Sequence, residues 1–187
     1  MNLPNKLTTF RIILIPIFIL LLSIPIHWIK IFNHPLSWLI AAFIFAIATL
    51  TDVADGRIAR SKHLITNFGK FADPMADKMI VMTAFIYLTS FHIIPAWATS
   101  IIVIRELAVT GLRILIVEQN GTIMAAKLPG KIKTVTQMLA IIFLLCSNFS
   151  IPFVPVDQII FYIAVIFTIY SGIEYFISYK NVFAGEI

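Results

Sequence analysis

Six apolar segments, each near the length that a helix needs to cross a bilayer, constrain the fold of this chain most. A bilayer core of about 30 Å takes about 20 helical residues to cross. The segments are residues 7–27, 36–50, 70–90, 95–118, 133–149 and 157–179. The second segment reaches full length only if its helix continues beyond residue 50. We therefore predict an all-α integral membrane protein, with six transmembrane helices in a single domain over residues 1–187.

Composition agrees with a bilayer environment. Hydrophobic residues make up 60% of the chain and charged residues only 12%, whereas soluble domains run nearer half apolar and a quarter charged. The first apolar segment is followed by neither a small-residue cleavage pattern nor a polar domain, so we expect it to be a retained span. The single cysteine, Cys146, excludes an intramolecular disulfide.

The basic residues predict the orientation of the helices. Most of them lie near the N-terminus, between spans two and three, between spans four and five, and near the C-terminus: Lys6, Arg57, Arg60, Lys62, Lys70, Lys127, Lys131, Lys133 and Lys180. The opposite junctions hold only Lys30. By the positive-inside rule, the sequence predicts a multi-pass protein of the cytoplasmic membrane, with both termini and the active site on the cytoplasmic side.

Four of the nine acidic residues fall within residues 52–77. Asp52 and Asp55 are spaced to lie on one helix stripe, and Asp73 and Asp77 on another. A short link makes the two helices antiparallel neighbours, so we expect all four carboxylates to face a common cleft. Their mutual repulsion demands cations, and ligand oxygens without Cys or His suit Mg²⁺ or Mn²⁺.

The complete spacing is Asp-x2-Asp-Gly-x2-Ala-Arg-x8-Gly-x3-Asp-x3-Asp over residues 52–77. It resembles, without a departure, the signature of the CDP-alcohol phosphotransferases. The resemblance implies transfer from a CDP-linked lipid to a hydroxyl-bearing acceptor, with release of CMP. It also implies that two divalent cations are bound by Asp52, Asp55, Asp73 and Asp77, and that Asp77 takes the proton of the acceptor.

The resemblance extends to the nucleotide part of the donor. It implies that the CDP-lipid is bound by Gly56, Ala59, Arg60, Thr66 and Gly69. The small residues in this set also suit ordinary helix packing, and Thr66 also suits a helix N-cap.

The segment before the first span resembles the nucleotide-side segment of the same family. Its pattern Asn5-x2-Thr8-x2-Arg11 adds Asn5 and Thr8 to the predicted CDP-lipid contacts. Asn5 equally suits a helix N-cap, and Arg11 a membrane-interface anchor.

Basic residues in spans four and five predict where the acceptor binds. Arg105 and Arg113 lie inside a membrane segment, and Lys131 and Lys133 open the next one. Such charges are costly at membrane depth and call for an anion, so we expect a phosphate-binding pocket. Pairing of Arg105 with Glu106, Asp73 or another internal acid is the structural alternative, and cytoplasmic anchoring is the alternative for the lysines.

A phosphate pocket favours a phosphorylated acceptor. The stretch 105–113 and the later 130–138 resemble phosphatidylglycerophosphate synthases, which implies CDP-diacylglycerol and glycerol 3-phosphate as substrates. The resemblance further implies a homodimer among membrane lipids, and we expect no nucleic-acid partner. Inositol phosphate, serine and phosphatidylglycerol remain alternative acceptors. A divalent-cation transporter remains a distant alternative, disfavoured because the outer halves of the spans are nearly all apolar.

Overall fold

The computed structural model describes residues 3–24, 30–31, 34–61, 67–118, 128–146 and 155–180. Within these ranges, the side chains of residues 3–7, 30–31, 34, 52–61, 67–74 and 117–118 are outside the description. The described elements are helices α1 (Leu3–Ser23), α2 (Leu36–Ser61), α3 (Asn67–Ser90), α4 (Ala96–Glu118), α5 (Leu128–Leu145) and α6 (Val156–Ser178). A two-residue strand pair, β1 (Lys30–Ile31) with β2 (His34–Pro35), precedes α2.

The helices follow the predicted segments with shifted ends. The second segment continues without a break to Ser61, as the carboxylate spacing required. Helix α5 begins at Leu128, five residues earlier than the predicted span, so Pro129 lies in its first turn rather than between helices. Proline is tolerated there because first-turn N–H groups have no partner within the helix.

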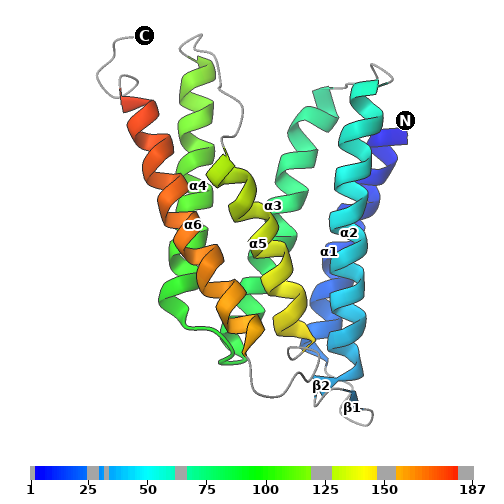
Figure 1. Cartoon of the computed structure of the whole chain (residues 1–187). Coiled ribbons are helices and arrows are strands. Elements are labelled where there is room, and N and C mark those ends of the chain that lie inside the picture. The colour runs from blue at the N-terminus through cyan, green and yellow to red at the C-terminus, as the bar shows by residue number, and fades with distance from the viewer. Residues whose placement is uncertain are drawn as a thin grey trace.

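Successive helices run in opposite directions (Figure 1). The N-terminal end of α1 lies at the same end of the bundle as the C-terminal ends of α2, α4 and α6 and the N-terminal ends of α3 and α5. The strand pair and the tight turn between α3 and α4 lie at the opposite end. At that turn His92 has a φ of 58°, and the His92 N–H donates to the Thr89 carbonyl at 2.9 Å, ending α3 with a left-handed residue.

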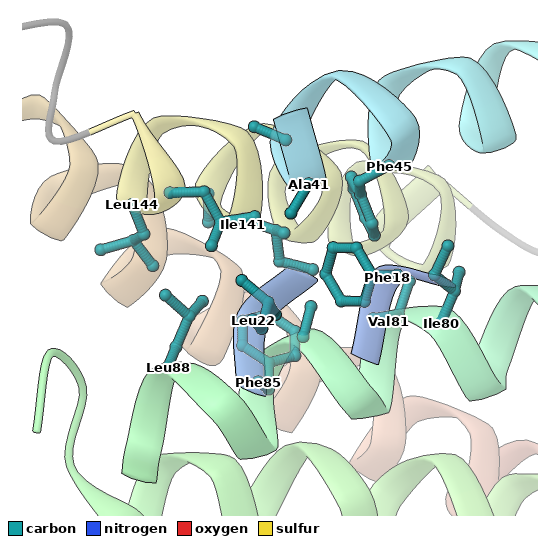
Figure 2. Packing of buried hydrophobic residues seen from close by; sticks show 14 of the residues in the cluster. Phe18, Leu22, Ala41, Phe45, Ile80, Val81, Phe85, Leu88, Ile141 and Leu144 are labelled. Atoms are coloured by element: carbon teal, nitrogen blue, oxygen red, sulfur yellow. The ribbon is translucent and has the colours of Figure 1, made fainter. Parts of the chain in front are cut away.

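A continuous apolar core joins all six described helices, with Ala98 and Ile102 contributed by α4. Phe18 of α1 packs near Phe45 of α2, with ring centroids 6.2 Å apart, and Phe85 of α3 near Phe161 of α6, at 6.1 Å. Figure 2 shows several of these side chains converging between the helices. This core packs α2 as far as Ala48 and α3 from Ile80 onward, on either side of the segment that carries the aspartates.

Large apolar side chains also cover the outside of the bundle. Every helix exposes at least one of them, for example Ile13, Phe43, Ile86, Ile104, Val135 and Ile166. Helices α5 and α6 are long and apolar enough to cross a membrane, within the part of the chain that the structure describes. Polar side chains such as Glu106, Gln137 and Thr168 are instead buried. Apolar surfaces outside and polar groups inside are typical of a protein surrounded by lipid.

Candidate functional site

The two halves of the aspartate motif lie on the facing ends of α2 and α3. Because α2 continues to Ser61 and α3 begins at Asn67, both carboxylate pairs lie within helices, at the end of the bundle that holds the start of α1. The side chains of seven predicted residues are outside the description: Asp52, Asp55, Gly56, Ala59, Arg60, Gly69 and Asp73. Thr66 lies wholly outside the described residues, and so does the side chain of Asn5.

Asp77 is the aspartate whose side chain the structure describes, and it forms an ion pair with Arg11. The Arg11 Nη1 donates to the Asp77 Oδ1 at 2.7 Å, across 66 positions of sequence. The Arg11 side chain is 1% exposed and that of Asp77 30%. Arg11 therefore supplies a buried counter-charge from α1 while the carboxylate remains accessible.

The predicted N-terminal segment thus meets the aspartate motif. Thr8 is fully buried one turn before Arg11, on the helix that contacts Asp77. A cavity of about 10 Å³ borders Arg11, Thr49 and Asp77, room for about one water molecule.

A larger cavity of about 260 Å³ lies between α3, α4, α5 and α6. We call it the cationic cavity, because four of its lining residues are basic. Its lining residues are Lys78, Arg105, Glu106, Val109, Arg113, Gly130, Lys133, Thr134, Ser171, Glu174, Tyr175, Ser178 and Tyr179. The four helices therefore bring basic residues that are up to 55 positions apart in sequence, Lys78 and Lys133, to one space.

Two of the four cations share one buried carboxylate. Glu106 Oε1 accepts from Lys133 Nζ and, at 3.3 Å, from Arg105 Nη1. Arg105 Nη2 also donates to Ser171 Oγ at 3.0 Å. Its Nε is buried without a hydrogen-bond partner among the residues described. Arg105, Glu106 and Lys133 thus form a cluster that links α4, α5 and α6 at the cavity wall.

The other two cations contact neutral groups. Lys78 Nζ donates to Thr110 Oγ1. Arg113 Nε donates to Tyr175 Oη at 3.3 Å, and the guanidinium lies 5.5 Å from the centroid of the same ring. In the described part of the chain neither forms an ion pair with a carboxylate.

The structure brings together three of the four predicted acceptor-binding residues. Arg105, Arg113 and Lys133 line the cationic cavity, whereas Lys131 is exposed on α5 and does not line it. The ion pair between Arg105 and Glu106, considered as an alternative, is present inside the same cavity. The structure thus confirms the pairing of Arg105 with Glu106, and phosphate binding by the cavity stays a prediction.

Lys78 is the cavity residue that sequence reasoning missed. A signal for it exists, because it is an ionisable residue inside an apolar segment, directly after Asp77. The direction in which it points could not be derived from the aspartate stripe, because consecutive helical residues point about 100° apart.

The donor chemistry of the motif fits hard divalent cations. Carboxylate oxygens are the ligands that Mg²⁺ and Mn²⁺ prefer, and Asp77 presents an accessible carboxylate in the first half of α3. Among the side chains that are described, no group of three or more His, Cys, Asp or Glu is placed to hold a metal ion. The other three predicted ligands lie outside that set.

Comparison with known proteins assigns a family. A sequence model of the CDP-alcohol phosphatidyltransferase family matches residues 1–170. A protein of Bacillus subtilis (strain 168) named CDP-diacylglycerol–glycerol-3-phosphate 3-phosphatidyltransferase is 45% identical, over 94% of this chain and 93% of its own. Proteins of the same name from Rickettsia typhi and Shigella flexneri serotype 5b are 36% and 35% identical, again over more than nine-tenths of each chain.

Proposed function

This chain belongs to the CDP-alcohol phosphatidyltransferase family, and from that premise we propose that it transfers the phosphatidyl group of CDP-diacylglycerol to glycerol 3-phosphate. The observation that carries this proposal is the 45% identity, over nearly the whole of both chains, with a relative named for that reaction. Membership makes the protein a transferase of phospholipid biosynthesis. It also removes the cation transporter that the aspartates alone had allowed.

The charge of the cationic cavity supports a phosphorylated acceptor. Lys78, Arg105, Arg113 and Lys133 contribute four positive charges, and Glu106 and Glu174 two negative ones, which leaves a formal excess of two. A phosphate monoester carries about −1.5 to −2 at neutral pH. The volume of about 260 Å³ lies just below that of pockets for drug-sized ligands, roughly 300–1,000 Å³. It therefore suits a small acceptor such as glycerol 3-phosphate.

The reaction needs a nucleophilic hydroxyl and a diphosphate leaving group. The acceptor oxygen attacks the phosphorus that bears diacylglycerol, the bond from this phosphorus to the bridging oxygen breaks, and CMP leaves with that oxygen. Asp77 takes the hydroxyl proton, and Arg11 holds the Asp77 carboxylate in place through its ion pair. The cationic cavity orients the acceptor through its phosphate.

Asp52, Asp55, Asp73 and Asp77 would hold two divalent cations, Mg²⁺ or Mn²⁺. When bound, these ions neutralise charge on the diphosphate and favour in-line displacement.

Asn5, Thr8, Gly56, Ala59, Arg60, Thr66 and Gly69 would bind the CDP part of the donor. The burial of Thr8 next to the Arg11–Asp77 pair supports the N-terminal part of this site.

In the proposed arrangement, the chain crosses the membrane six times, with both termini and the active site facing the cytoplasm. The family resemblance further implies that the protein forms a homodimer. The first helix begins and the last helix ends at the same end of the bundle in Figure 1, which supports an even number of crossings. The basic residues concentrated at the end that carries the aspartates support its cytoplasmic side.

The test is the release of CMP by the purified protein in detergent, with CDP-diacylglycerol and Mg²⁺ or Mn²⁺. Glycerol 3-phosphate is compared with glycerol, serine, inositol 1-phosphate and phosphatidylglycerol. We expect release with glycerol 3-phosphate alone, and its loss on addition of EDTA. Release with a different acceptor only would leave the family assignment intact and overturn the acceptor.

The same assay tests the role of Asp77. Asp77→Asn is expected to lower turnover by about 10²-fold or more, because it removes the proton acceptor. Asp157→Asn is the matched control, since Asp157 lies in the first turn of α6, where its Oδ1 accepts from the Gln158 N–H. Wild-type turnover by Asp77→Asn would exclude this residue as the base.

A further inference from the structure

Lys78 is the cavity cation that lies next to Asp77 in the sequence and on the same helix. It follows Asp77 directly on α3, and the two side chains point to different neighbours. Asp77 contacts Arg11 of α1, whereas Lys78 contacts Thr110 of α4 and lines the cationic cavity. Among the described lining residues, Lys78 is the one that α3 contributes. One turn of α3 therefore joins the proposed base to the wall of the acceptor site.

The contact with Thr110 leaves most of the Lys78 ammonium available. Thr110 Oγ1 donates its own proton to the Glu106 carbonyl at 2.6 Å, so toward Lys78 it acts as an acceptor. A lysine ammonium has three donors, and this contact uses one of them. No carboxylate among the described residues pairs with Lys78. Toward the described residues, its other two donors therefore remain available to a ligand in the cavity.

The four cations consequently divide into two pairs. Arg105 and Lys133 are bridged by Glu106, whereas the partners of Lys78 and Arg113 among the described residues are hydroxyl groups and an aromatic ring. The cluster of Arg105, Lys133 and Glu106 keeps one positive charge, and Lys78 and Arg113 carry two more that no described ion pair offsets. With the negative charge of Glu174, these leave the formal excess of two. A dianionic phosphate monoester between α3 and α4 would neutralise this excess.

We propose that Lys78 binds the phosphate of the acceptor and, together with Arg113, selects a phosphorylated alcohol over an uncharged one. The assignment rests on the proposed function and adds a specificity-determining residue to it. Neighbouring Cα atoms are about 3.8 Å apart, so a phosphate held by Lys78 keeps the acceptor against the helix that carries Asp77. Arg105 and Lys133, held by Glu106, shape the opposite wall.

The test uses the full chain, purified in detergent, as wild type, Lys78→Met and Lys78→Arg. The dissociation constant of glycerol 3-phosphate is measured by calorimetry, and the KM of each substrate by CMP release. Loss of a charge-assisted hydrogen bond predicts a rise of about tenfold or more in both constants for glycerol 3-phosphate in Lys78→Met. The KM of CDP-diacylglycerol is expected to stay within about twofold of the wild type. Lys78→Arg keeps the charge and should restore most of the affinity.

Lys180→Met is the matched control. Lys180 is exposed just after α6 and does not line the cavity, so its loss should leave both constants unchanged. If Lys78→Met does not fold, Thr110→Val tests the same step by removing the hydroxyl that positions the ammonium, and it should raise the same constants by a smaller factor.

Three outcomes overturn the assignment. The first is wild-type affinity for glycerol 3-phosphate in Lys78→Met, or in Thr110→Val where that variant replaces it. The second is an equal rise in the KM of both substrates, which would indicate a structural role. The third is a wild-type protein that neither binds nor uses glycerol 3-phosphate; here the proposed function fails first, and the role of Lys78 fails with it.

Discussion

At the scale of single residues, Glu106 determines how the charge of the cationic cavity is distributed. It is 7% exposed, and its carboxylate contacts both Lys133 and Arg105. Buried ions are stable only when they are paired and hydrogen-bonded. Glu106 therefore stabilises two cations that would otherwise repel each other, and it holds them in place before any substrate arrives.

Glu106→Ala is expected to destabilise the protein and to make its stability depend on phosphate. Removing one partner of a buried ion pair costs about 3–5 kcal/mol, so the Tm of the variant should fall. Inorganic phosphate should then raise the Tm of the variant more than that of the wild type, because the anion replaces the missing carboxylate. Glu106→Gln keeps an acceptor oxygen, so the rise of its Tm with phosphate should lie between those of the wild type and Glu106→Ala. An equal response to phosphate in all three proteins would exclude this role.

At the scale of elements, the close approach of α4 and α6 forms one side of the cavity. Gly172 of α6 lies under the Arg105 side chain, where an added Cβ would be 3.1 Å from the Arg105 Cγ. Tyr175, one turn further along α6, contacts Arg113. A single face of α6 thus positions both arginines of α4, which makes the packing of these two helices part of the proposed acceptor site.

Gly172→Val tests this dependence. Overpacking at a close contact costs about 1–3 kcal/mol, and here the strain falls on Arg105. We expect a lower Tm and a KM for glycerol 3-phosphate that rises several-fold, with the KM of CDP-diacylglycerol unchanged. Gly111→Val on α4 is the control, because a Cβ at Gly111 meets nothing within 4 Å. Similar effects at both glycines would mean that helix propensity, rather than contact with Arg105, is responsible.

The elements themselves were predictable from the sequence, and the contacts between them were not. Long apolar runs predicted the six helices, and the spacing of Asp52 and Asp55 correctly required α2 to continue past Leu50. The predicted ends of the helices were less accurate. The start of α5 near Pro129 was placed too late, because proline suits both a linker and the first turn of a helix. The pairing of Arg11 with Asp77, and the turn of Lys78 toward Thr110, depend on helix rotation and packing. A single sequence does not fix these quantities.

At the scale of the whole molecule, the distribution of polarity is reversed relative to a soluble bundle. Exposed isoleucine, leucine and phenylalanine side chains cover the helices, while charged residues such as Arg11, Glu106 and Lys133 are buried. Lipid can surround the apolar surface, and the interior then supplies the polar environment that a charged acceptor needs. The reaction is thereby placed where a lipid-anchored donor and a water-soluble acceptor meet.

The proposed topology predicts which residues are accessible from each side of the membrane. The chain has one cysteine, the buried Cys146, so Cys146→Ala provides a cysteine-free background. Ser90 ends α3 and Lys180 follows α6, both are exposed, and the two helix ends lie at opposite ends of the bundle (Figure 1).

In intact cells, a membrane-impermeant thiol reagent should label Ser90→Cys. Lys180→Cys should react only after the membrane is permeabilised, because the positive-inside rule places that end in the cytoplasm. Labelling of both positions from outside would contradict the arrangement of the spans. Labelling of Lys180→Cys alone would reverse their orientation and separate the site from a cytoplasmic acceptor.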